Sequence, residues 1–152
     1  MRYAIATFGC RVNQADSLQL EMELRARGGT RASVDDADLV VVNSCSVTAS
    51  ADQGTRQALR RVERVNPKAR VVATGCYAQR SPEALGRLEE VDLIMGNTQK
   101  ASLVAQVMER RRDTPVPCAT GADTDPITLS ALRTRAMVKI QEGCDQICAY
   151  CI

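Results

Sequence analysis

Three short apolar stretches, each followed within a few residues by a cysteine and then by a helix-forming stretch, recur in the first half of the chain. The apolar stretches are residues 3–8, 38–43 and 70–74, and the cysteines are Cys10, Cys45 and Cys76. They recur at intervals of about 30 residues, the length of a strand followed by a helix. A fourth unit, with a strand at 91–95, has no cysteine. Continuous apolar strands that alternate with helices predict an α/β fold, an open parallel sheet covered on both faces.

Helices are expected after each of these strands. Leu18 to Arg27 is rich in helix formers, Asn13, Asp16 and Ser17 are suitable caps, and Gly28-Gly29 ends the segment. Leucine and methionine alternate in this segment as they would in a strand, but residue propensity and the glycine pair favour a helix. Further helices are expected at about residues 50–65, from Ser81-Pro82-Glu83 onward, and at about residues 100–112.

The three cysteines come just after the carboxyl ends of their strands. Loops from parallel strands emerge at one edge of the sheet, where ligands bind in open α/β folds. Cys10, Cys45 and Cys76 can therefore meet at one site. The alternative is that each is a small residue filling a tight turn, which three successive units disfavour.

A second group of thiols lies near the end of the chain. Cys144, Cys148 and Cys151 follow Gly143 in a C-x₃-C-x₂-C pattern, which lets three soft ligands converge on one metal cluster. Three ligands leave one iron open for chemistry. An odd total of seven cysteines disfavours a disulfide framework, and a zinc site would want a fourth cysteine or a histidine, of which the chain has none. Core cysteines without a ligand role are the remaining alternative.

The composition changes between residues 113 and 135, where prolines gather among Thr, Asp and Ala. This stretch is expected to be a linker between a first domain at 1–112 and the start of a second at 136–152. Cys118 lies in the linker and has no assigned role. A new strand is expected at 136–141, but a complete barrel needs ~200 residues, so the second domain is expected to be truncated.

Overall charge and composition narrow the function. The net charge of +2 does not by itself indicate a nucleic-acid partner. Two groups of arginines could bind phosphate, but a solvent-exposed helix face or helix end explains them equally well. They are Arg56, Arg60, Arg61 and Arg64, and Arg110 to Arg112. The absence of histidine excludes Ser-His-Asp and Cys-His catalysis. There is no apolar run of ~18 residues, so no membrane partner is expected, and the chain is predicted to be cytoplasmic with reduced thiols.

Several motifs together resemble one enzyme family. The chain is similar to the methylthiotransferases of the radical S-adenosylmethionine superfamily, and within them most like the branch that modifies N6-threonylcarbamoyladenosine beside the tRNA anticodon. The resemblance covers almost the whole chain except the linker. It is carried by residues 7–14 (TFGCRVNQ), 42–48 (VNSCSVT), 74–79 (TGCYAQ), 96–98 (GNT) and 139–144 (KIQEGC).

The resemblance implies a flavodoxin-like first domain followed by the first strand and cluster loop of a radical S-adenosylmethionine barrel. The loop with Cys144, Cys148 and Cys151 would hold a [4Fe-4S] cluster that binds S-adenosylmethionine and generates a 5′-deoxyadenosyl radical. Tyr150 would lie near the adenine of that cofactor, although simple packing in the loop is the alternative. Acid-base groups cannot activate carbon 2 of adenine, which explains why a radical is used there.

By the same resemblance, a second [4Fe-4S] cluster would be held by the other three thiols, Cys10, Cys45 and Cys76, and would handle the sulfur. A second S-adenosylmethionine would supply the methyl group. The implied partners are a tRNA substrate and an electron donor such as a flavodoxin or ferredoxin, and the 152-residue chain alone is expected to be inactive.

Two alternatives remain. The substrate could be that of another branch, isopentenyladenosine in tRNA or an aspartate of a ribosomal protein. The chain could instead be a non-catalytic flavodoxin-like electron carrier or metal-binding module. The turn after the first strand, residues 9–13, is not G-x-G-x-x-G, which weakens a flavin or dinucleotide role.

Overall fold

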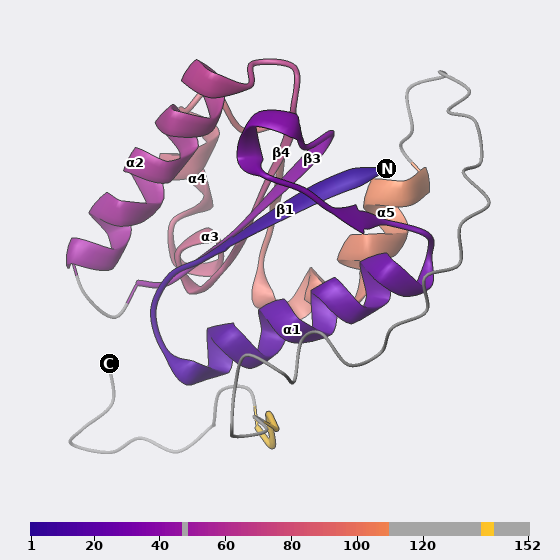
Figure 1. The fold of residues 1–152 in the computed structure, drawn as a ribbon. Coiled ribbons are helices and arrows are strands. Elements are labelled where there is room, and N and C mark those ends of the chain that lie inside the picture. Colours follow the sequence, from indigo (N-terminus) through magenta and orange to yellow (C-terminus); the bar gives the residue numbers. More distant parts are fainter. Residues whose placement is uncertain (47–48, 110–137, 142–152) are drawn as a thin grey trace.

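A computed structural model gives the fold and describes residues 1–46, 49–109 and 138–141. Five strands form one sheet in which every neighbouring pair is parallel, in the order β2-β1-β3-β4-β5 (Figure 1). This is the strand order of flavodoxin-like folds. The predicted α/β fold with a parallel sheet is therefore confirmed. The strands are β1 (Arg2–Thr7), β2 (Thr30–Arg31), β3 (Leu39–Ser44), β4 (Arg70–Gly75) and β5 (Leu93–Met95).

Helices cover both faces of the sheet. The 16-residue α1 and the shorter α5 lie on one face, and α2, α3 and α4 lie on the other (Figure 1). Two 3₁₀ segments, η1 and η2, complete the connections. The bounds are α1 (Arg11–Ala26), η1 (Val34–Asp36), α2 (Ala49–Val65), α3 (Cys76–Arg80), α4 (Pro82–Gly86), η2 (Asn97–Ser102) and α5 (Leu103–Glu109).

Strand β3 is the centre of the core, and all six of its residues are buried. Because successive side chains of a strand point to opposite faces, Val40 and Val42 pack toward α2, while Leu39 and Val41 pack toward α1. Leu59 of α2 is fully buried in the first of these clusters. A central strand buried on both faces explains why the segment is a continuous apolar run in the sequence.

Helix α1 begins at Arg11, well before the predicted start at Leu18. Asn13, Asp16 and Ser17 were predicted to cap this helix, and that prediction is wrong, since all three lie inside it and are buried. Their side chains bind other parts of the chain instead. The choice of a helix over a strand for this segment was correct.

Three other features of the structure differ from the sequence-based picture. The two-residue edge strand β2 and the short helix α3, which begins at Cys76 itself, were not predicted. The last helix was expected from about Lys100, but the turn starts as 3₁₀ structure at Asn97, and residues 110–112 lie outside the described part.

The strand expected at 136–141 is not formed by its described residues, 138–141. Val138 and Ile140 are 79% and 93% exposed. A strand persists only when a neighbouring strand takes its backbone hydrogen bonds, and no described strand pairs with this segment. The predicted linker, 113–135, lies outside the described residues. Within the described ranges, no helix combines the length and apolar character that a membrane span requires.

Candidate metal centre

Cys10, Cys45 and Cys76 follow three strands that are neighbours in the sheet. Strand β3 pairs with β1 on one side and with β4 on the other. The register places Thr7 opposite Asn43 and Ser44 opposite Gly75, so the three strands end at nearly the same level. The sequence-based placement of the three cysteines at one sheet edge agrees with the structure.

The three thiols differ in their surroundings. Cys10 is exposed, Cys45 is buried and Cys76 is partly buried, and all three are free of disulfide bonds. In the described part of the chain, no three Cys, Asp or Glu side chains gather closely enough to hold a metal ion. The backbone thus brings the cysteines to one edge, but their side chains do not form a closed set of ligands there.

Two glycines make the approach of these loops possible. Gly9 has a φ of +94° and Gly75 a φ of +96°, a backbone region that side-chain-bearing residues rarely adopt. A Cβ at residue 9 would overlap the Cβ and Sγ of Cys45, and one at residue 75 would overlap the carbonyl oxygen of Ser44. Each glycine therefore lets a strand turn sharply and lie directly against the neighbouring strand end.

Asn13 joins the ends of β1 and β3. Its Nδ2 donates to the carbonyl oxygens of Phe8 and Ser44, both at 2.8 Å. Its Oδ1 accepts a long contact of 3.9 Å from the Sγ of Cys76. One buried side chain in α1 thereby contacts the residue after β1, the last residue of β3 and the first residue of α3, which fixes the spacing of these strand ends.

The sulfur of Cys76 also faces a second amide. Asn97 Nδ2 points at this Sγ from 3.9 Å, and the backbone N–H of Asn97 donates to Gln79 Oε1 at 2.9 Å. Hydrogen bonds to sulfur are one means by which proteins tune iron–sulfur clusters. The Oδ1 of Asn97 is buried and has no hydrogen-bond partner among the described residues, as expected where a bound group or water completes a site.

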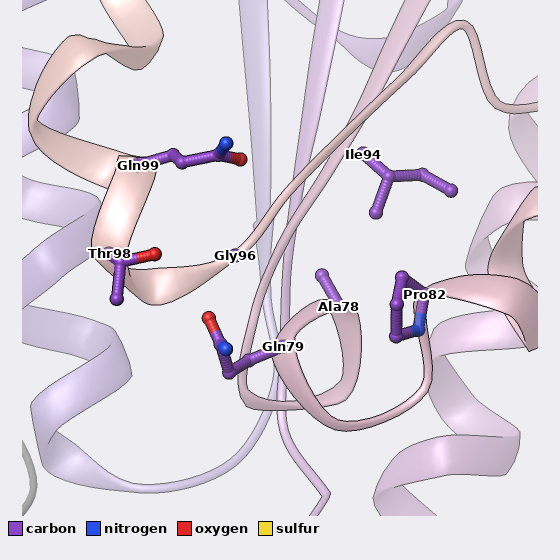
Figure 2. A pocket seen from close by; sticks show the side chains of 7 residues that line it. All are labelled: Ala78, Gln79, Pro82, Ile94, Gly96, Thr98 and Gln99. Atoms are coloured by element: carbon purple, nitrogen blue, oxygen red, sulfur yellow. The ribbon is translucent and has the colours of Figure 1, made fainter.

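A pocket of about 290 Å³ lies beside the end of β5. It lies between α3, the start of α4 and the β5–η2 turn, and in Figure 2 the Gln79 side chain reaches toward the turn at Gly96. The lining side chains are aliphatic, amide and hydroxyl groups. They are Ala78, Gln79, Pro82, Ile94, Gly96, Thr98 and Gln99.

The donors at this edge suit a cluster of iron and sulfur. Thiols are soft ligands, Gly9 lets its turn lie directly against the Cys45 side chain, and an amide N–H faces the Cys76 sulfur. The supporting residues Asn13 and Asn97 were missed as site residues by sequence reasoning. Both lie in motifs that carry the family resemblance, residues 7–14 and 96–98, and this was the available signal.

The second predicted thiol group is not covered by the structure. Cys144, Cys148, Cys151 and the neighbouring Tyr150 lie outside the described residues, as does Cys118. Their roles remain predictions.

One protein family matches the part of the chain that forms the sheet. A family described as "Uncharacterized protein family UPF0004" matches residues 2–96, which include β1 to β5 and the three cysteines of the sheet edge. The chain belongs to this family.

Similar proteins are named as tRNA methylthiotransferases. The chain is 39% identical to the "Threonylcarbamoyladenosine tRNA methylthiotransferase MtaB" of Aquifex aeolicus, over 100% of this chain and 39% of that protein. It is 31% identical to the protein of the same name from Bacillus subtilis, over 98% of this chain and 35% of that protein. It is 34% identical to the "tRNA-2-methylthio-N(6)-dimethylallyladenosine synthase" of Flavobacterium johnsoniae, over 97% of this chain and 33% of that protein. The expected resemblance is confirmed, and the chain spans only a third to two-fifths of these relatives.

Proposed function

We propose that this chain is the N-terminal part of a tRNA-modifying enzyme that methylthiolates carbon 2 of N6-threonylcarbamoyladenosine at position 37 of tRNA. The proposal rests mainly on one observation: three adjacent parallel strands are each followed, at their carboxyl ends, by a cysteine. These are Cys10, Cys45 and Cys76. The names of the relatives point to the same activity.

Two [4Fe-4S] clusters and S-adenosylmethionine would supply the radical and sulfur chemistry when bound. Cys10, Cys45 and Cys76 would hold one cluster, and Cys144, Cys148 and Cys151 the other, with Tyr150 near the adenine of S-adenosylmethionine. Three thiols per cluster would leave an iron uncovered at each.

The chain's own residues would position and shield the first site. Gly9 and Gly75 bring the loops together, while Asn13 ties two of the strand ends. Cys45 is 2% exposed and so keeps its sulfur from water, whereas Cys10 faces solvent and leaves an open side for substrate. Asn97 donates toward the Cys76 sulfur and would tune the electron density there.

The same proposal assigns the chain's parts. Residues 1–112 form the domain of the first cluster, 113–135 the linker, and 136–152 the start of the radical S-adenosylmethionine domain. The partners are tRNA and a reducing flavodoxin or ferredoxin, in the cytoplasm. This 152-residue piece alone does not turn over, because later strands build the S-adenosylmethionine pocket.

Anaerobic reconstitution of the full-length protein with iron and sulfide tests the ligand assignment. Cys10→Ala, Cys45→Ala and Cys76→Ala are each expected to remove one cluster and to spare the other. Cys144→Ala, Cys148→Ala and Cys151→Ala should remove the other one. Cys118→Ala is the matched control and should retain both clusters by iron content and Mössbauer spectrum. Bound zinc, or a single cluster in the unsubstituted protein, refutes the two-site assignment.

Substrate is tested by nucleoside analysis of tRNA from a strain that lacks the full-length gene. Loss of the methylthio form of threonylcarbamoyladenosine supports the proposal. Loss of the methylthio form of isopentenyladenosine would instead assign the branch to which the Flavobacterium relative's name belongs. Unchanged tRNA would favour the ribosomal-protein branch.

A non-catalytic electron carrier is the second candidate, favoured by the flavodoxin-like strand order. Such a module would bind a redox group at the same sheet edge without a tRNA substrate. It predicts unchanged tRNA together with reversible reduction of a single bound cluster, and this pair of results separates it from the methylthiotransferase.

A further inference from the structure

Asp16, in the middle of helix α1, is a buried carboxylate with two lysine partners. Lys100 Nζ lies 2.7 Å from its Oδ2, and Lys139 Nζ lies 2.6 Å from its Oδ1. The Asp16 side chain is 2% exposed, that of Lys100 8% and that of Lys139 24%. The two lysines come from distant parts of the chain, the turn after β5 and the segment 138–141.

The two ion pairs have different electrostatic roles. Burial acts to raise the pKa of Asp16, but hydrogen bonds from Lys100 and Lys139 and their charges outweigh it and hold that pKa below its ordinary value. One ammonium already neutralises one carboxylate, and Lys100 is the more deeply buried of the two. A second ammonium leaves an excess positive charge, so neutralising Asp16 does not by itself require Lys139.

Lys139 instead connects a separate segment to the domain. Its neighbours Val138 and Ile140 are 79% and 93% exposed, so they do not pack into the domain core. The Lys139 side chain nevertheless reaches a carboxylate inside that domain. The ion pair with Asp16 is thus a specific attachment of the segment 138–141 to helix α1.

Asp16 is also linked to the cysteine edge by buried polar groups. Lys100 Nζ lies 3.5 Å from Asn43 Oδ1, and Asn43 Nδ2 donates to the Asn13 carbonyl oxygen at 2.8 Å. Asn13 Oδ1 in turn contacts the Sγ of Cys76. A charge at Asp16 is therefore held at a fixed position relative to the first thiol group.

We propose that Asp16 is the docking point for the segment that leads into the second thiol group, so that the Asp16–Lys139 pair positions the two groups relative to each other. Cys144 follows Lys139 by five residues, and five residues span at most about 18 Å. Asp16 and Lys139 are positioning residues and touch neither cluster. The purpose of the docking rests on the proposed function, but the contact itself does not.

Distances between spin labels in the full-length protein test the docking without metal or activity. Genetically encoded ketone side chains at Met22 on α1 and at Ile140, both exposed, accept the labels without involving thiols. The unsubstituted protein is expected to give a single narrow distance by pulsed electron paramagnetic resonance. Lys139→Met should abolish that narrow distance, and Lys139→Arg should retain it because the charge is kept.

Controls separate docking from general loss of structure. Lys68→Met removes an exposed lysine of the same size and should keep the narrow distance. Asp16→Asn should lose the narrow distance. Adding Lys139→Met to Asp16→Asn should then change the distance distribution no further. A narrow, unshifted distance in Lys139→Met overturns the proposal, even if Asp16→Asn fails to fold. Because the readout needs no cluster, failure of cluster reconstitution would refute the proposed function and leave this result standing.

Discussion

Replacing Gly9 by alanine tests whether the turn before Cys10 is shaped by contact with Cys45. A side chain at a φ of +94° costs about 1–2 kcal/mol from the backbone alone. The new methyl group would also overlap the Cβ and Sγ of Cys45, which is buried, and forced overpacking against a buried side chain costs about 1–3 kcal/mol. We expect Gly9→Ala to lower the free energy of unfolding by about 2–5 kcal/mol, a large part of the ~5–15 kcal/mol typical of a domain.

Gly28 provides the matched control. It has a φ of +78°, and a Cβ built there meets no atom within 4 Å. Gly28→Ala therefore carries the backbone cost without the overlap. Urea unfolding of the metal-free protein, with reductant, measures both variants. The contact argument is refuted if Gly9→Ala is no more destabilising than Gly28→Ala, or if alkylation of Cys45 proceeds at the same rate in both.

Two further predictions concern stability. The pKa of Asp16 is lowered in the folded protein, so the stability that its carboxylate contributes should be complete above the ordinary pKa of about 3.8 and should be lost as the pH falls through the folded pKa. Asp16→Asn should remove this acid-dependent part of the free energy of unfolding measured in urea. An unchanged pH profile in Asp16→Asn would contradict the prediction. Leu59→Ala, at a fully buried position packed against β3, should lower the free energy of unfolding by about 2–5 kcal/mol in the same assay. If it lowers that free energy less than Met22→Ala does at an exposed position, α2 does not depend on this packing.

The strands and the cysteine positions were predictable because both depend on local patterns. Continuous apolar runs such as residues 39–42 mark strands buried on both faces, and a residue just after such a run must lie at the carboxyl edge of a parallel sheet. The placement of Cys10, Cys45 and Cys76 needed nothing else. The glycines before Cys10 and Cys76 also mark the ends of their strands in the sequence, and both have a positive φ in the structure.

The polar interior was not predictable in the same way. Asn13, Asp16 and Ser17 are residue types that cap helices, and nothing local distinguishes a cap from a buried hydrogen-bond partner. Their partners, Ser44, Asn43 and Lys100, are 26 to 84 residues away in the sequence. Only the folded sheet brings them together. The strand expected at 136–141, which its described residues 138–141 do not form, has a related cause, since a strand pattern does not specify the neighbour that it requires.

The level ends of β1, β3 and β4 constrain which changes in chain length the protein can accept. One residue inserted into β4 would move everything after it by about 3.3 Å and turn the next side chains to the opposite face. Cys76 would then leave the edge that it shares with Cys10 and Cys45, although every residue type was kept. Insertions are instead tolerable at the far end of each unit, such as the exposed turn at Pro67 and Lys68, where they change no strand length. Length changes among relatives of this chain should therefore gather at the amino ends of the strands.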